Sequence, residues 1–139
     1  MRYYAKTKKQ TLILAKKFAK RLKGGEIIGL IGNLGAGKTF FTKVLAVNLG
    51  IKKNIISPTF VLMKIHKVNK HKQIKFFIHI DAYRIKLAND LIAIGINEYF
   101  DRQDTVMVIE WADKIKKILS KKTKIIKIAI NRTGRTIDF

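Results

Sequence analysis

One glycine-rich segment constrains the fold of this 139-residue chain more than any other feature. Residues 32–39 read GNLGAGKT, which matches the pattern Gly-x-x-x-x-Gly-Lys-[Ser/Thr] at every fixed position. An apolar segment, Glu26–Ile31, precedes it, and an amphipathic segment, Lys38–Leu49, follows it and is closed by Gly50. This order predicts a buried strand, a tight loop and a helix.

A loop of this kind binds phosphate for physical reasons. Glycines let the backbone wrap closely around an anion, and the helix N-terminus adds N–H donors and the positive end of its dipole. In this pattern Lys38 reaches the β- and γ-phosphates, and the Thr39 hydroxyl ligates Mg²⁺. The segment therefore predicts an ATP or GTP site. Its expected nucleotide-binding residues are Gly32, Asn33, Leu34, Gly35, Ala36, Gly37, Lys38, Thr39 and Phe40.

The choice between ATP and GTP depends on residues outside this loop, because the loop contacts only phosphates. The guanine-binding motif of GTPases, Asn-Lys-x-Asp, is absent as written. Its nearest equivalent, NKHK at residues 69–72, lacks the aspartate. The sequence therefore favours ATP.

Strand and helix patterns alternate along the rest of the chain. A helix is expected over Thr7–Lys23, where Thr7 and Gln10 form a capping box and Gly24-Gly25 ends the helix. The alternation predicts a single α/β domain, residues 1–139, with a P-loop NTPase-like mixed sheet, mainly parallel central strands and helices on both faces. The other expected strands are Thr59–Val68, Gln73–Ile80, Thr105–Ile109, Lys124–Ile130 and Arg135–Phe139, and short helical pieces are expected in Leu87–Phe100, broken at Gly95, and in Asp113–Leu119.

Composition narrows the cellular setting. The chain has no cysteine, which excludes disulfides, thiolate zinc sites and cysteine catalysis. Its longest apolar runs, such as Phe76–Ile80, are far shorter than the roughly 20 residues that span a bilayer. The basic N-terminus lacks the apolar core of a signal peptide. These features favour a cytoplasmic protein with no membrane association.

The net charge of +21 has two explanations. A strongly basic chain can bind RNA, DNA or a partner that carries nucleic acid. Alternatively, the abundance of Lys, Ile and Asn reflects the residue usage of AT-rich coding sequence. The lysines are spread along the whole chain rather than gathered in one run, which favours residue usage.

Acidic residues are scarce, nine in all, so those that follow apolar strands are informative. Asp81 follows the strand-like residues 76–80, and Glu110 follows residues 106–109. In P-loop proteins a carboxylate at the carboxyl end of a neighbouring strand binds Mg²⁺ or orients water. Either residue fits this role; the alternative is that each caps the next helix or pairs with a lysine.

Other features have more than one interpretation. Ser57–Phe60 lies where the switch loops of NTPases occur, so Thr59 either offers its hydroxyl to the γ-phosphate or its metal, or belongs to an ordinary turn. Trp111 either packs in the core or stacks near the nucleotide. Arg84 either brings positive charge to the phosphates or pairs at the surface. The three histidines show no metal-ligand spacing and are interpreted as structural or surface residues.

Together these segments resemble the TsaE (YjeE) family, the small bacterial ATPase subunit of the machinery that makes threonylcarbamoyladenosine in tRNA. By this resemblance Lys38 binds phosphate, Thr39 and Glu110 hold Mg²⁺, and Asp81 supports hydrolysis. Thr59 then belongs to a switch-like loop, and Trp111 lies close to the nucleotide. The signature segments span almost the entire chain in the family's order: GNLGAGKT at 32–39, SPTF at 57–60, HIDAYR at 79–84, GINEYF at 95–100 and IEWADK at 109–114.

The resemblance also implies partners. Family members act with the paired subunits TsaB and TsaD; TsaD transfers the threonylcarbamoyl group, and the TsaE-like ATPase drives or resets that complex between turnovers. Contact with tRNA is then indirect. Two departures stand out: Phe40 occupies the place where the family commonly has a second threonine, and the chain ends soon after its last strand, which is expected to trim the nucleotide site.

These residues predict Mg²⁺-dependent ATP hydrolysis by positioning and electrostatics. Backbone amides of Gly35–Thr39 and the Lys38 ammonium neutralise the phosphates, while Asp81 or Glu110 orients the attacking water. No arginine finger is evident, so slow hydrolysis is expected until a partner completes the site. Two alternatives are a small-molecule or nucleoside kinase, which would carry a basic lid and an acceptor pocket, and a non-enzymatic RNA-binding module, which depends on charge alone.

Overall fold

The structure is a computed structural model that describes residues 1–52, 55–56 and 62–139. Its strands are β1 (Arg2–Ala5), β2 (Ile27–Ile31), β3 (Met63–Lys67), β4 (Phe76–Asp81), β5 (Thr105–Glu110), β6 (Lys124–Asn131) and β7 (Gly134–Asp138). Its helices are α1 (Lys8–Ala19), α2 (Lys38–Asn48) and α3 (Asn89–Ala93), with the 3₁₀ segments η1 (Ile96–Tyr99) and η2 (Ala112–Ile118).

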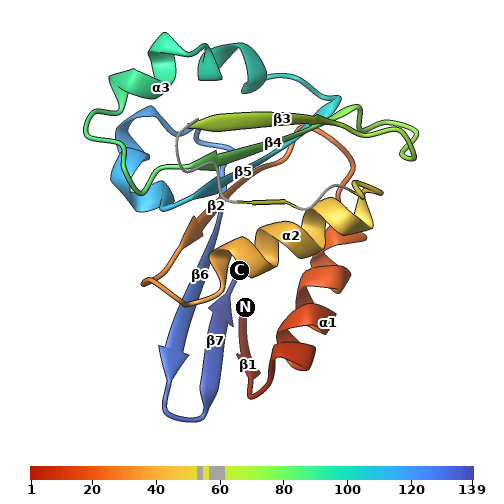
Figure 1. Cartoon of the computed structure of the whole chain (residues 1–139), viewed down its shortest axis with the longest axis vertical. Helices are drawn as coiled ribbons and strands as arrows, with labels where there is room; N and C mark the ends of the chain where they lie inside the picture. The colour runs from red at the N-terminus through yellow and green to blue at the C-terminus, as the bar shows by residue number, and fades with distance from the viewer. Residues whose placement is uncertain (53–54, 57–61) are drawn as a thin grey trace.

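The described strands form one mixed sheet in the order β1-β7-β6-β2-β5-β4-β3. The central strands β6, β2, β5 and β4 are parallel to one another, whereas β3 pairs antiparallel with β4, and β7 pairs antiparallel with both β6 and β1. Figure 1 shows α1 and α2 on one side of the sheet and α3 on the other. The predicted α/β fold is therefore confirmed.

Side chains on each central strand alternate between two apolar cores, as the pleat of a strand requires. On the side of α1 and α2, Phe77 of β4, Val106 and Val108 of β5 and Ile28 of β2 pack with the helices. Residues one position away, such as Ile78 and Ile109, pack on the other side with α3, η1 and η2. Continuing this alternation directs the side chains at positions 79, 81 and 110 toward α2.

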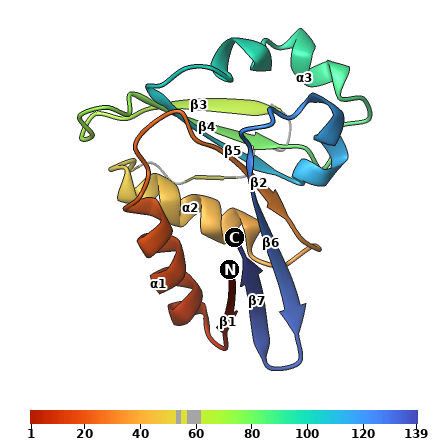
Figure 2. The same ribbon diagram turned by 180° about the vertical axis from the view of Figure 1, so that it is seen from behind.

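The two ends of the chain differ most from the prediction. The expected helix over Thr7–Lys23 ends at Ala19, and β1 was not predicted at all. Thr7 caps α1 as expected, but the Gln10 side chain accepts from the backbone N–H of Lys6, one residue before the expected donor. β1 is a short edge strand that forms by pairing with β7, more than a hundred residues away. Figure 2 shows the two chain ends side by side in the resulting β1–β7 arrangement.

The remaining elements follow the prediction closely. Gly95, with φ of 85°, separates α3 from η1 as expected. The segment expected as a helix over Asp113–Leu119 is the kinked 3₁₀ segment η2. The predicted strand Thr59–Val68 is described only in part, because residues 57–61 lie outside the described residues; its described portion contains β3. No helix in the described part of the chain is long and apolar enough to cross a membrane.

A glycine in β2 lets η2 pack directly on the sheet. A Cβ added to Gly29 would lie 2.8 Å from Ile125 Cδ1 and 2.9 Å from Ala112 Cβ. Ala112 is the first residue of η2, directly after Trp111, so this close approach determines where the segment after β5 can turn.

We expect Gly29→Ala to destabilise the protein by about 1–3 kcal/mol through overpacking. Backbone propensity alone predicts the opposite sign, because replacing glycine with alanine inside a strand ordinarily gains about 0.5–1 kcal/mol. The free energy of unfolding from urea titration measures the effect. Adding Ala112→Gly should recover part of the loss, since it removes one of the clashing atoms; strictly additive losses, or a stabilised Gly29→Ala variant, would contradict the packing explanation.

Candidate functional site

The glycine-rich loop between β2 and α2 has the backbone geometry of an anion cradle. Gly35 and Gly37 have φ of 76° and 109°, in the left-handed region that favours glycine. A Cβ at Gly35 would meet no atom within 4 Å, so the loop is open at this point. α2 begins at Lys38 without a side-chain cap. The N–H groups of its first turn are therefore not bonded to a capping side chain and fit an anion.

Lys38 is 4% exposed, and its ammonium group contacts the loop itself. Its Nζ donates to the carbonyl oxygens of Gly32, at 2.6 Å, and Asn33, at 2.9 Å. The same nitrogen lies 3.6 Å from the centroid of the Trp111 ring, in a cation–π contact. Burial lowers the pKa of Lys38 below its ordinary value, and nearby carboxylates offset this effect only in part.

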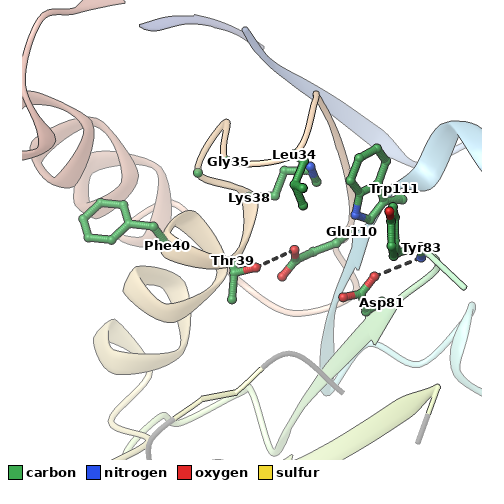
Figure 3. A pocket seen from close by; sticks show the side chains of 10 residues that line it. Leu34, Gly35, Lys38, Thr39, Phe40, Asp81, Tyr83, Glu110 and Trp111 are labelled. Atoms are coloured by element: carbon green, nitrogen blue, oxygen red, sulfur yellow. Dashed lines mark hydrogen bonds between the residues drawn. The ribbon is translucent and has the colours of Figure 1, made fainter. Parts of the chain in front are cut away.

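The carboxylate of Glu110, only 2% exposed, joins the end of β5 to the start of α2. The Thr39 hydroxyl donates to Oε2 over 2.8 Å. Figure 3 marks this hydrogen bond. On the other oxygen, Oε1, the Thr42 hydroxyl lies at 3.3 Å and His79 Nε2 at 2.8 Å. The two residues expected to share a metal ion are thus in direct contact.

Asp81 lies beside Glu110 because β4 and β5 are parallel and these two residues are paired in register. Its Oδ1 accepts from the backbone N–H of Tyr83 at 2.9 Å. The Tyr83 ring lies 4.9 Å from the Trp111 ring, centroid to centroid. Trp111 has a backbone φ of 59°, in the left-handed region that residues other than glycine rarely adopt. This conformation turns the chain sharply after Glu110.

Lys38, Thr39, Glu110 and the residues around them line a pocket of about 330 Å³. Its lining side chains are drawn in Figure 3. Most of the predicted site residues belong to this pocket, and Tyr83 joins them. Of the other predicted residues, Gly32 and Asn33 hold Lys38 through their carbonyls, and Ala36, within the loop, is fully buried. The lining residues are Leu34, Gly35, Gly37, Lys38, Thr39, Phe40, Asp81, Tyr83, Glu110 and Trp111.

Some sequence predictions do not join this group. Thr59, with the rest of the segment 57–60, lies outside the described residues. Arg84 is exposed and does not line the pocket. His71 is a structural residue, since its Nδ1 accepts from the backbone N–H groups of Gln73 and Ile74.

Sequence reasoning missed two residues that the structure connects to the site. His79 is fully buried and contacts Glu110; the alternation of β4 could have revealed it, because position 79 shares a face with Asp81. Arg135 of β7 donates from Nε to the carbonyl of Ala36 at 2.9 Å, across 99 residues of sequence. No local pattern indicates this second contact.

Comparison with known proteins places the chain in one family, by a family model and by individual relatives. Residues 5–137 match the family described as "Threonylcarbamoyl adenosine biosynthesis protein TsaE". The chain belongs to the TsaE family. The tRNA threonylcarbamoyladenosine biosynthesis protein TsaE of Rickettsia prowazekii is 40% identical over 115 residues, which cover 82% of this chain and 76% of that protein. Its Bacillus subtilis counterpart is 36% identical over 125 residues, covering 90% and 73%.

A solved structure supports the fold. The crystal structure of Bacillus subtilis YdiB superposes with a TM-score of 0.77 at 30% sequence identity, covering 99% of this chain and 82% of that chain. The predicted family resemblance is therefore confirmed.

We expect Arg135→Met to weaken binding of ATP, the ligand predicted from the sequence, about five- to tenfold, because it leaves the carbonyl of the buried Ala36 without its charged donor and loosens the loop. Titration with a fluorescent ATP analogue measures this. Arg132→Met is the matched control, since Arg132 is an exposed residue near the turn between β6 and β7. Equal affinities for the two variants would show that Arg135 does not support the loop.

Proposed function

We propose that this chain binds ATP with Mg²⁺ in the pocket at the start of α2 and hydrolyses ATP as an accessory subunit of tRNA threonylcarbamoyladenosine biosynthesis. The observation that carries the proposal is the 2.8 Å hydrogen bond between the Thr39 hydroxyl and Glu110 Oε2. It brings a hydroxyl of the phosphate loop and a carboxylate of a neighbouring strand to one point. Oxygen ligands of these two kinds are those that Mg²⁺ uses beside nucleotide phosphates.

Each residue then has a distinct task. Lys38 and the N–H groups of the loop bind the phosphate oxygens, and Thr39 and Glu110 hold the metal ion, which supplies further charge neutralisation when bound. Asp81, beside Glu110 on the next strand, orients the attacking water. Trp111 and Tyr83 form an aromatic wall of the pocket that limits access of bulk water to the phosphates.

We expect the isolated chain to hydrolyse ATP slowly, and the support for this expectation is the set of residues that line the pocket. No arginine of the described residues lines it, whereas arginine fingers often supply the charge that stabilises transferring phosphoryl groups. We propose that subunits resembling TsaB and TsaD bind near the pocket and complete it, and that tRNA contact occurs through that assembly. Hydrolysis would then drive or reset the assembly between turnovers.

We expect Lys38→Ala and Glu110→Gln each to reduce ATP turnover about tenfold or more, because each removes charge that acts on the phosphates or the metal. Phosphate release with and without the two partner subunits measures this, and a reaction without the chain provides the blank. Glu98→Gln is the control, since Glu98 is an exposed carboxylate of η1 outside the pocket.

Two results would overturn the proposal. Full activity of both variants in the assembled complex would exclude this pocket as the hydrolytic site. A phosphorylated small molecule in place of phosphate release would indicate a kinase on the same scaffold.

A further inference from the structure

The buried contact between His79 and Glu110 has no part in the mechanism above. His79 lies on β4, two residues before Asp81, and its side chain is completely excluded from solvent. Histidine in the middle of an apolar strand is costly to bury unless its polar atoms are bonded. Its Nε2 lies 2.8 Å from Glu110 Oε1. The contact therefore accounts for a polar ring at this position.

The direction of this hydrogen bond follows from the chemistry of the two groups. An ionised carboxylate only accepts, so His79 Nε2 must carry the proton. The opposite ring nitrogen, Nδ1, is buried and has no hydrogen-bond partner among the described residues. A proton on Nδ1 would lack an acceptor there, so the geometry favours the tautomer that donates from Nε2 to Glu110.

His79 is also the principal donor to Oε1. Among the described residues the other donor to that oxygen is the Thr42 hydroxyl, which lies farther away, at 3.3 Å, and has a nearer acceptor in the carbonyl of Lys38 at 3.0 Å. A hydroxyl has a single proton, so Thr42 cannot fully satisfy both acceptors. Oε1 therefore depends mainly on His79.

We infer that His79 is the positioning residue of Glu110: it holds Oε1, which leaves Oε2 directed toward the Thr39 hydroxyl and the metal position beside it. The metal part of this inference rests on the proposed function, whereas the hydrogen bond does not. Groups that orient a ligating carboxylate commonly change metal affinity about 10- to 100-fold when they are lost. Loss of His79 should thus weaken Mg²⁺ binding and spare binding of nucleotide without metal.

The tautomer is tested first, on the full chain without nucleotide. The sequence contains three histidines, so ¹⁵N-labelled imidazole signals can be assigned by comparison with His79→Gln. We expect the His79 signal to show a proton on Nε2, and its chemical shift to change in Glu110→Gln. A proton on Nδ1, or a signal that is insensitive to Glu110→Gln, would overturn the inference.

Metal binding is tested with a matched pair of amides. The side-chain nitrogen of glutamine stands as many bonds from Cα as His79 Nε2, whereas that of asparagine stands one bond closer. We expect His79→Asn to raise the Mg²⁺ concentration for half-maximal ATP binding about tenfold, and His79→Gln to restore most of the loss. Affinity for ADP in EDTA should be the same in all three proteins.

The outcomes separate positioning from a structural role and from failure of the proposed function. If both variants lose ADP affinity in EDTA together with thermal stability, or if neither shifts the Mg²⁺ dependence, His79 does not position Glu110. If the unmodified chain binds ATP independently of Mg²⁺, the proposed metal site fails, and the tautomer experiment alone then decides whether His79 orients the carboxylate.

Discussion

A carboxylate removed from water is stable only when donors surround it, and the arrangement around Glu110 meets this requirement. Its donors come from α2 and β4, so one side chain at the end of β5 ties the helix after the phosphate loop to two neighbouring strands. Thr42 extends the connection because it also bonds the carbonyl of Lys38 within the helix. The orientation of α2 over the sheet edge is thus fixed by polar contacts in addition to apolar packing.

The parts of the fold that were predictable are those in which local sequence decides the outcome. The strand, glycine loop and helix around residues 32–39 follow from steric freedom at glycine and from hydrophobic period, and the break at Gly95 follows from its backbone conformation. β1 could not be predicted in this way. It is four residues long, lies at an edge and forms only because β7 pairs with it. Pairing between segments so far apart in the sequence produces no hydrophobic periodicity that would mark a strand as short as β1.

The residues of the site likewise fall into those that local sequence predicts and those that only the fold brings together. Lys38, Thr39, Asp81, Glu110 and Trp111 were predicted from the loop pattern, the positions after apolar strands and the family resemblance, and the structure brings them to one pocket. Their chemical roles remain predictions. The contact of Arg135 with the loop required three-dimensional placement, because it joins the last strand to a segment 99 residues away. The alternation of β4 could have placed His79 on the face that carries Asp81, but its hydrogen bond to Glu110 crosses between adjacent strands.

The electrostatics of Lys38 explain why this arrangement suits an anion. The hydrogen-bond acceptors around its ammonium group are neutral carbonyls and the face of an indole ring. No carboxylate of the described residues lies within ion-pair distance of it, and burial lowers its pKa. The fold therefore holds a cation in a site where its charge is only partly compensated. On the proposed function, a bound phosphate would supply the missing negative charge and offset the cost of burying this cation in the folded chain. Glu110 is close enough to favour the charged form of Lys38, but its carboxylate accepts from Thr39 and makes no ion pair with the ammonium group.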